Sequence, residues 1–539
     1  MDLLSTRNLL FRYSYLLIPV IWFFSILLCI FFIFGFYTKD IMRINSVLVA
    51  VLILLYPNIL DGKILKIQNK LNSYLEIFSK WIFINPWKCG VIVFFILFFS
   101  YGLKGFYLTD TGYDTGFFLQ ALSNPYLNGT YQLVSFENNA SFFRNHFQPY
   151  LFLLFPFKYL PYPSIFLYST AYIFLSLTLV IGIKFINSEF DFPIVQKITL
   201  LLTCLSSPFW DGLSSYEFHE LALVPFFYLL IFISWYNKSI IKIIFFSLMA
   251  LSLKETVAIT FIFSGLLMII FGKSFDKKAG LALFLMGSII YMLYFKVILV
   301  SLYDKSNSYF ISYYSTLGNT MLEVALSPFL KTQNWLIAML QSKNIIYIFY
   351  VILPVILYLK GGFKALFFAF PLIYTSILAS GKNLLDYKNQ YGGELVIPLC
   401  ICAFFGYKHL IKKNKLQNLF FNQRLLLSFS IIVFFEFLFI NPVQGMKELH
   451  KNKENVKFTY ELQNLPLNYV VLTNTSSVFP FVGQREKIIL KEYTSEISPE
   501  QFLGVNYFIY LDNGIYKIKT PINAKIVSNY KDYYLYKID

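Results

Sequence analysis

The residues of this chain that suit acid–base chemistry gather in a few short polar segments. Residues 109–118 hold two carboxylates, Asp110 and Asp114, four positions apart. In a helix this spacing places them one turn from each other, beside an apolar run where burial raises the pKa of a carboxyl group. Such a carboxylate suits a general base that takes a proton from an acceptor hydroxyl. The alternative is that both residues cap a short interfacial helix.

Two later segments carry polar side chains of other types. Arg144 and His146 lie at the entrance to an apolar stretch and suit binding the phosphate of a lipid-linked leaving group, although Arg144 also suits contact with lipid headgroups. Glu217 and His219 would share one face of an extended segment, whereas Glu220 would neighbour Glu217 only in a helix. We expect these residues to bind a substrate by hydrogen bonds, because four histidines in the whole chain are few for a metal site.

Lys254 and Glu255 interrupt an otherwise apolar segment, residues 243–272. Ionisable groups at such a depth usually face a polar cavity or each other. We therefore expect the pair at the tip of a helical hairpin. The alternative is an interfacial turn whose ion pair contributes little to stability.

The elements that must position these residues are membrane helices. The 539 residues are 57% hydrophobic and 14% charged, and the mean hydropathy is +0.60. A bilayer core of about 30 Å needs about 20 apolar residues per helix. The sequence therefore predicts an α-helical polytopic membrane protein of about 13 transmembrane helices. The longer predicted spans are residues 13–38, 44–60, 89–103, 159–183, 221–237, 256–272, 279–295, 344–359 and 365–381, and the shorter ones are residues 198–210, 243–253, 395–407 and 425–435.

The distribution of lysine and arginine predicts the orientation of the chain. Both collect in alternate loops, which places the N-terminus in the cytoplasm. The net charge of +16 then reflects topology, and its spread over many loops argues against a nucleic-acid partner. All candidate residues fall in the opposite set of loops. We expect a multi-pass plasma-membrane protein with one extracytoplasmic working face.

Three regions follow from this pattern. Residues 1–88 are predicted to form an N-terminal transmembrane hairpin and a basic cytoplasmic loop, and residues 89–441 a transmembrane core with an acidic first extracytoplasmic loop, residues 104–158. Residues 442–539 are more polar and predict a small extracytoplasmic α/β domain. Its predicted strands are residues 469–472, 487–490, 507–511 and 533–538. The five cysteines lie in or beside apolar runs, which predicts neither a disulfide framework nor a zinc site.

The order of four motifs resembles a known family. The motifs are Tyr113-Asp114-Thr115-Gly116-Phe117, His146-Phe147-Gln148-Pro149, Phe218-His219-Glu220 and Leu253-Lys254-Glu255. Together they resemble the predicted membrane proteins called domain of unknown function 2079, from Gly112 to the C-terminus. The chain departs from that pattern at Glu220, where a proline is usual, at Thr256, where an acidic residue is usual, and near Tyr391, where a basic residue or histidine is expected. These departures weaken the transfer of roles to Glu220 and to the loop around Tyr391.

The layout of that family is similar to GT-C glycosyltransferases, which implies transfer of a sugar from a polyprenyl-phosphate carrier to an unidentified acceptor on the outer face. Asp114 or Asp110 would then be the base. The resemblance implies a substrate-binding set of Arg144, His146 and Lys254 for the carrier phosphate and Glu217 and His219 for sugar hydroxyls, with Glu220 and Glu255 beside them. Membrane lipids are the other expected partners.

Other functions stay open at this point. A transporter or flippase would also place charges within the membrane, but we find no internal repeat that supports it. A noncatalytic membrane assembly protein is a third possibility. No cofactor is predicted to be required, and a divalent cation stays an open alternative. The enzymatic hypothesis predicts that Asp114, His146, His219 and Lys254 converge on one outward-facing cavity.

Overall fold

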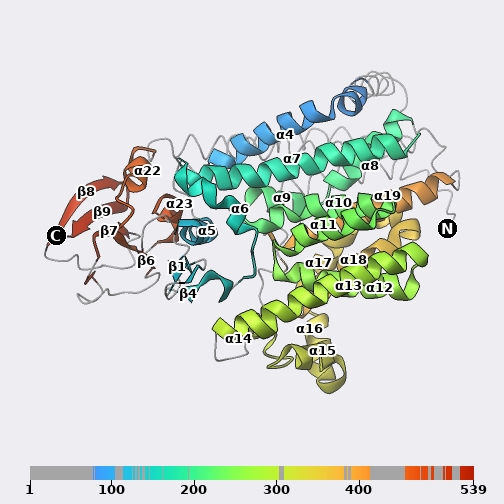
Figure 1. Ribbon diagram of the computed structural model, residues 1–539. Helices are drawn as coiled ribbons and strands as arrows, with labels where there is room; N and C mark the ends of the chain where they lie inside the picture. Colours follow the sequence, from blue (N-terminus) through green and yellow to red (C-terminus); the bar gives the residue numbers. More distant parts are fainter. Residues whose placement is uncertain are drawn as a thin grey trace, which may run out of the picture.

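The computed structural model describes residues 77–103, 113–302, 309–380, 390–412 and 456–538, and residue 385. Short gaps within these ranges lie at 78, 124–125, 128–129, 132–133, 136–139, 145, 161, 192, 474, 483–486, 491–501, 504 and 513–522. The described chain forms a body of long helices with a small β-sheet at one end (Figure 1). It is a mostly helical membrane protein with several apolar spans and a C-terminal sheet.

Apolar helices make up the body. By length and composition, four described segments can cross a membrane, and five apolar helices are shorter. The four long segments are Pro163–Glu189, Ser274–Ser301, Pro354–Leu378 and Gly393–Lys412. The labelled helices are α4 (Pro86–Ser100), α7 (Pro163–Glu189), α8 (Ile194–Leu205), α9 (Phe209–Ser215), α10 (Val224–Tyr236), α11 (Ile240–Leu251), α12 (Glu255–Phe271), α13 (Ser274–Met292), α14 (Leu299–Leu302), α15 (Met321–Leu330), α16 (Thr332–Met339), α17 (Ser342–Ile352), α18 (Leu359–Leu378) and α19 (Gly393–Lys412).

Most predicted spans in the described residues coincide with helices, with two corrections. The predicted span at residues 198–210 is broken between α8, which ends at Leu205, and α9, which begins at Phe209. We predicted separate spans at residues 344–359 and 365–381. The structure ends α17 at Ile352, continues as the 3-10 turn η8 (Leu353–Tyr358), and forms one apolar segment over Pro354–Leu378. Pro354 lies in the first turn of η8, where its missing N–H group leaves no intrahelical hydrogen bond unmade. The predicted spans at 13–38, 44–60 and 425–435 lie outside the described residues.

Glycines let neighbouring helices of the body approach closely. A Cβ atom at Gly265 of α12 would lie 2.5 Å from the carbonyl oxygen of Gly280 of α13, and one at Gly287 would lie 2.7 Å from the carbonyl oxygen of Ala258. Small residues at such contacts are a common way for membrane helices to pack. Large apolar side chains point outward instead, as Phe271 does at 79% exposure. This arrangement suits a body that faces lipid.

The C-terminal sheet has five strands in the order β6-β5-β7-β9-β8. β5 pairs in parallel with β6 and β7, and β9 pairs antiparallel with β7 and β8. The strands are β5 (Val470–Thr473), β6 (Lys487–Leu490), β7 (Tyr507–Leu511), β8 (Ala524–Tyr530) and β9 (Tyr533–Ile538). The sequence predicted four of them to within one residue and missed β8, whose burial pattern is largely exposed.

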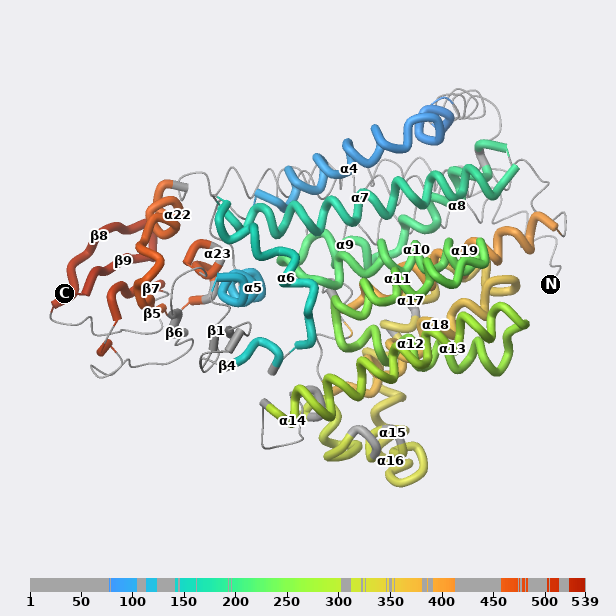
Figure 2. The backbone as a smooth tube through the Cα atoms, viewed as in Figure 1, coloured from blue at the N-terminus to red at the C-terminus, as the bar shows by residue number. Residues whose placement is uncertain are grey.

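A short helix, α5 (Tyr113–Ser123), lies between the helical body and the sheet (Figure 2). It contacts α23 (Phe479–Val482), which follows β5, and the rings of Tyr113 and Phe479 lie 5.9 Å apart. A Cβ atom at Gly116 would overlap the side chain of Phe479. The C-terminal region therefore packs directly on the helix that carries Asp114.

The rest of this polar region consists of short elements. After α5 come two strand pairs, β1 (Tyr126–Leu127) with β2 (Thr130–Tyr131) and β3 (Val134–Ser135) with β4 (Ala140–Ser141). The turn η3 (Phe142–Arg144), α6 (Leu151–Leu154) and η4 (Phe155–Tyr159) then lead into α7. Other short elements are η5 (Glu220–Ala222), the π-helical turn η6 (Leu293–Ile298), η7 (Tyr309–Tyr314), η10 (Gln390–Gly392), α22 (Val456–Gln463) and η13 (Ser476–Val478).

Candidate functional site

The first turn of α5 holds Asp114, which is half-buried. Tyr216, just beyond the end of α9, donates a hydrogen bond from its hydroxyl to the Asp114 carboxylate. Burial raises the pKa of Tyr216, and the negative charges of Asp114 and Glu217 raise it further. The phenol therefore stays protonated and keeps donating to the carboxylate. Asp110 lies outside the described residues.

Glu217 joins α5 from a distant part of the chain. Its carboxylate accepts a hydrogen bond from the backbone N–H of Thr115 at 3.0 Å, and Glu217 is buried. The first N–H groups of a helix have no partner within the helix, and an acidic group there is favoured by the helix dipole. Glu217 thus caps α5 and lies beside Asp114. We call Asp114 and Glu217 the acidic pair.

His146 and Glu255 make a second contact across the chain. The Nδ1 atom of His146 lies 3.0 Å from one Glu255 oxygen, and the N–H of Phe147 donates to the other at 3.1 Å. The His146 side chain is 26% exposed, whereas that of Glu255 is 3% exposed. For this contact Nδ1 must carry a proton that it donates to the carboxylate. The imidazole is therefore oriented by Glu255 and partly accessible.

Glu220 has two partners, one at each carboxylate oxygen. Lys254 Nζ lies 2.7 Å from one Glu220 oxygen, and His219 Nδ1 lies 2.9 Å from the other. The N–H of Leu221 also approaches His219 Nδ1, at 3.4 Å. Nδ1 cannot accept that bond and donate to Glu220 at once, and we assign its proton to the shorter contact with the carboxylate. We call His146, His219, Glu220, Lys254 and Glu255 the ionic cluster.

Lys254 lies deep in this cluster, with 3% of its side chain exposed. Burial opposes its charge, but the carboxylates of Glu220 and Glu255 outweigh that effect and raise the pKa of Lys254 above its ordinary value. A buried charge without a partner is very costly, so the removal of one charged member destabilises the members that it contacts. A phosphate bound to Lys254 would have to displace Glu220.

The α11–α12 break positions Lys254 and Glu255. α11 ends at Leu251 and α12 begins at Glu255, so the pair occupies the turn that the sequence predicted. The N–H of Tyr150 donates to the carbonyl of Ser252 at 3.3 Å, which brings the His146 segment beside this turn. The ion pair at this turn is buried and joins Lys254 to Glu220.

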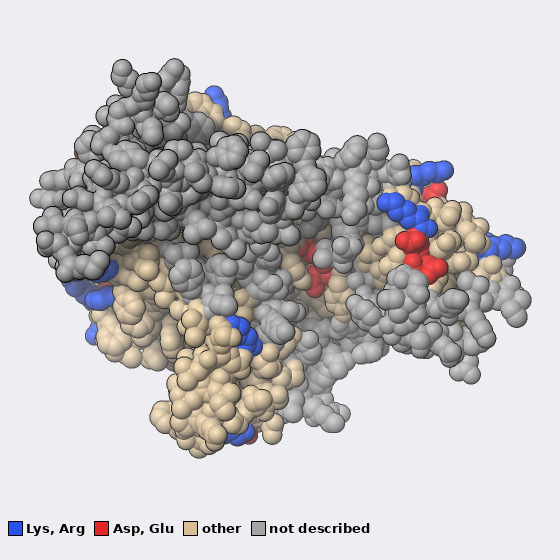
Figure 3. Space-filling model, turned by 180° about the vertical axis from the view of Figure 1, so that it is seen from behind, with Lys and Arg blue, Asp and Glu red and all other residues tan. Residues whose placement is uncertain are grey.

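Tyr391 lies near both the acidic pair and the ionic cluster. It lies in η10 (Gln390–Gly392), and its hydroxyl is close enough to raise the pKa of both Tyr216 and Lys254. The ring of His219 also packs edge-on against Phe118 of α5, the helix that carries Asp114, with the ring centroids 5.9 Å apart. Acidic side chains are visible in a recess between the helical body and the C-terminal sheet (Figure 3).

Some predicted features differ or are not described. Glu217 faces α5 and His219 faces Glu220, so the two side chains do not bind through one common face. Arg144 ends η3, and its side chain is not described. Among the described residues, no group of three His, Cys, Asp or Glu side chains has the arrangement of a metal site.

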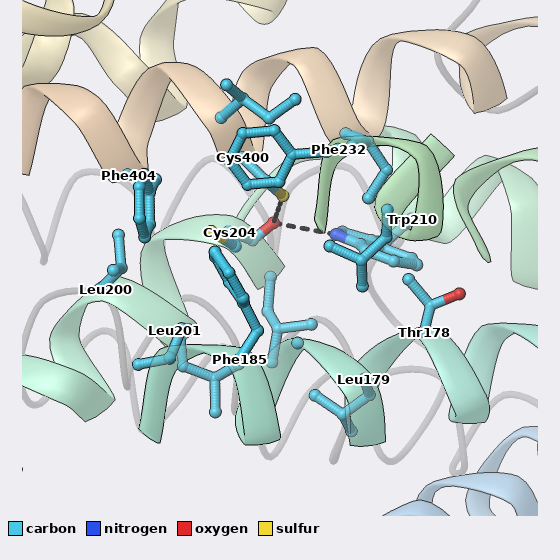
Figure 4. Close-up of a pocket in the computed structure, with 16 residues that line it drawn as sticks. Thr178, Leu179, Phe185, Leu200, Leu201, Cys204, Trp210, Phe232, Cys400 and Phe404 are labelled. Atoms are coloured by element: carbon cyan, nitrogen blue, oxygen red, sulfur yellow. Dashed lines mark hydrogen bonds between the residues drawn. The ribbon is translucent and has the colours of Figure 1, made fainter. Parts of the chain in front are cut away.

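Two cavities in the body are lined by residues other than the predicted site residues. The smaller, about 70 Å³, lies between α7, α8, α10 and α19 and is almost wholly apolar. There the carbonyl of Cys204 accepts hydrogen bonds from Trp210 Nε1 at 2.8 Å and from Cys400 Sγ at 3.9 Å (Figure 4). The larger, about 640 Å³, lies among α10, α11, α12, α13, α18 and α19. Asp114, His146, His219 and Lys254 line neither of these two cavities, and their convergence on one outward-facing cavity stays a prediction.

Sequence reasoning missed three residues of this region. Tyr216 directly precedes Glu217, and Tyr391 was considered only for the basic group it replaces. Glu394, at the start of α19, is a buried carboxylate in an apolar run. An ionisable residue at such a position is itself a signal of a site, and it could have been found on that ground.

Comparison with known proteins identifies the family. Residues 105–520 match the family described as Predicted membrane protein (DUF2079). The chain belongs to this family. An uncharacterized protein of Methanocaldococcus jannaschii is 28% identical over 151 residues, a segment that covers 28% of this chain and 24% of that protein. This DUF2079 chain thus matches about a quarter of the length of that relative.

Solved structures give one further likeness. Crystal structures of ArnT from Cupriavidus metallidurans, one bound to undecaprenyl phosphate and one in the apo state, align with a TM-score of 0.49 and 9% identity. The alignments cover 85% of this DUF2079 chain and 98% of ArnT. We draw no conclusion on activity from a likeness at this level.

Proposed function

We propose that this DUF2079 protein is a membrane glycosyltransferase that moves a sugar from a polyprenyl-phosphate carrier to an acceptor on the extracytoplasmic face. The observation that carries the proposal is the meeting of the acidic pair and the ionic cluster. Scarce ionisable groups from four distant segments gather at the end of the helical body that faces the C-terminal sheet. Such gatherings of perturbed groups are typical of functional sites.

Each accessible group has a role in this proposal. Asp114 takes the proton of the acceptor hydroxyl, because it is the half-buried carboxylate of the acidic pair and Tyr216 holds it in place. His146 is partly exposed and its Nδ1–H is engaged by Glu255, so in its doubly protonated form it donates from Nε2–H to the carrier phosphate as the bond to the sugar breaks, together with Arg144. Lys254 was expected to bind that phosphate directly. Its contact with Glu220 gives it a positioning role instead.

The transfer forms one bond to the anomeric carbon of the sugar and breaks another. The acceptor oxygen forms a bond to the anomeric carbon, the bond from that carbon to the phosphate oxygen breaks, and the acceptor proton goes to Asp114. Polyprenyl phosphate leaves with the electron pair, and its negative charge grows next to His146. Stabilising charge that develops in the transition state is among the largest contributions to catalysis.

The test is release of polyprenyl phosphate by purified protein supplied with a panel of polyprenyl-phosphate sugars and a membrane extract as the acceptor source. We expect turnover by the wild type and a loss of about 100-fold or more in Asp114→Asn, the usual size of a lost general base. Asp191→Asn is the matched control, because Asp191 is exposed in the loop after α7. Equal turnover by Asp114→Asn and wild type would reject the base, and no turnover with any donor would reject the transferase.

A further inference from the structure

A buried carboxylate of α19 contacts the ionic cluster from the interior of the body. Glu394 is 2% exposed and accepts three hydrogen bonds. Tyr228 of α10 donates to Oε2 at 3.0 Å, Thr260 of α12 donates to the same oxygen at 2.9 Å, and Thr256 of α12 donates to Oε1. One side chain thus ties together three helices.

Burying a carboxylate at this position costs free energy. A side chain that served only for packing would avoid this cost. It lies within an apolar helix, where ionisable side chains are rare and mark functional regions. A leucine or methionine of similar size would fill the same volume without the cost of removing a charge from water. The three donors show that the surroundings are built to hold an acceptor.

The contact with Thr256 links Glu394 to the ionic cluster. Thr256 directly follows Lys254 and Glu255 at the start of α12. Fixing the first turn of α12 therefore fixes the directions in which Lys254 reaches Glu220 and Glu255 reaches His146.

The start of α19 is itself held rigidly against the site. A Cβ atom at Gly393 would lie 2.5 Å from the carbonyl oxygen of Leu221, next to Glu220, and one at Gly392 would overlap Phe209 of α9. Tyr391, which lies near both the acidic pair and the ionic cluster, precedes them. Close contacts with Leu221 and Phe209 therefore hold the backbone next to Glu394 in place.

Two of the residues that donate hydrogen bonds to Glu394 also line the larger cavity. Tyr228 and Thr260 line that cavity of about 640 Å³, together with Ile397 and Pro398 of α19. Glu394 thus occupies the polar layer between an apolar cavity and the ionic cluster. A packing residue at this position would need no charge.

We propose that Glu394 is a positioning residue that holds the first turn of α12, and through it Lys254 and Glu255, in the geometry of the ionic cluster. The inference concerns how the cluster is held and does not depend on the transfer reaction. Its closest test is Thr256→Val, which keeps Glu394 and removes its bond to the first turn. Thr260→Val is the matched control, because it removes a bond to the same carboxylate one turn further from the cluster.

The readout uses the four histidines of the chain. In protein labelled with ¹⁵N-histidine, the signals of His146 and His219 report the cluster, and His409, further along α19, is an internal control. We expect Thr256→Val and Glu394→Gln to shift the His146 and His219 signals and leave His409 in place. Thr260→Val should shift them less. A lowered unfolding temperature with unmoved His146 and His219 signals would mean a purely structural role and would overturn the inference.

A kinetic readout separates this inference from the proposed reaction. If the transferase assay succeeds, Thr256→Val should lower kcat by about 100-fold with KM little changed, as expected for displaced catalytic groups. An equal fall in kcat in Thr256→Val and in its control Thr260→Val would contradict the inference. If the assay shows no transfer, the histidine signals still test the positioning role of Glu394. The two proposals can therefore be rejected independently.

Discussion

Lys254 and Glu220 show how a membrane protein keeps charges inside its body. Both side chains are almost wholly buried, and each has a partner of opposite charge or a hydrogen-bond donor. Removing one partner leaves the other buried charge without its nearest counter-charge, and breaking a buried pair typically costs about 3–5 kcal/mol. Removing both is often far less costly.

We therefore expect Lys254→Met and Glu220→Gln to be destabilising alone and less than additive together. A double-mutant cycle of unfolding in detergent should give a coupling energy of at least about 1 kcal/mol. Lys197→Met is the control, because Lys197 makes an exposed contact with Asn187, and it should have little effect. Strict additivity of the two variants would contradict the buried pair.

The pH dependence of this pair follows from the raised pKa of Lys254. A lysine whose pKa rises on folding stabilises the protein fully below its unfolded pKa of about 10.4, and loses that contribution only as the pH rises further through the folded value. Glu220, Glu255 and Tyr391 face this lysine. The difference in unfolding free energy between wild type and Lys254→Met should stay constant from about pH 8 to about pH 9.5. A steep decline across that window would show that Lys254 is not stabilised as a cation.

At the scale of elements, the contact between α5 and α23 is the joint that holds Asp114. Gly116 has no room for a Cβ atom beside Phe479, which is fully buried. Overpacking a close contact usually costs about 1–3 kcal/mol. Gly116→Ala should therefore lower stability and expose the C-terminal region to protease.

Gly182 in α7 offers the matched substitution, since its Cβ would meet only Leu229, at 4.0 Å. Alanine there should be neutral or stabilising by up to about 1 kcal/mol, the usual gain over glycine in a helix. Equal protease resistance of Gly116→Ala and Gly182→Ala would show that α5 and α23 do not pack as described.

Elements differed in how far the sequence predicted them. Long apolar runs such as residues 159–183 were clear, because length and composition alone indicate a membrane helix, and the structure has α7 there over Pro163–Glu189. Strand β8 was missed because its side chains are mostly exposed and show no hydrophobic alternation. The break at η8 was missed because Pro354 occurs inside a run that is apolar throughout.

The candidate site was predicted in its members more than in its contacts. Charged residues in apolar surroundings are visible in a sequence, so Asp114, His219 and Lys254 were found. Pairing is a property of three-dimensional packing, and no spacing shows that Lys254 meets Glu220 or that Glu217 caps α5. Glu394 was visible in the same way, at the start of an apolar run, but its partners on two other helices were not.

At the scale of the whole molecule, α5, which carries Asp114, and the C-terminal sheet lie toward one end of the helical body (Figure 1). The loop after α7, with Asp191, lies toward the other end. Positive charge in alternate loops predicts that the end with the sheet is extracytoplasmic. A polyprenyl-phosphate substrate would then meet its acceptor outside the cell.

Sidedness is the most direct test of this account. In a cysteine-free background, His146→Cys and Asp191→Cys are treated in intact cells with a membrane-impermeant maleimide. We predict that position 146 reacts in intact cells, since its side chain is 26% exposed, and that position 191 reacts only after permeabilisation. Reaction of position 191 in intact cells, with position 146 protected until the cells are opened, would contradict an extracytoplasmic site.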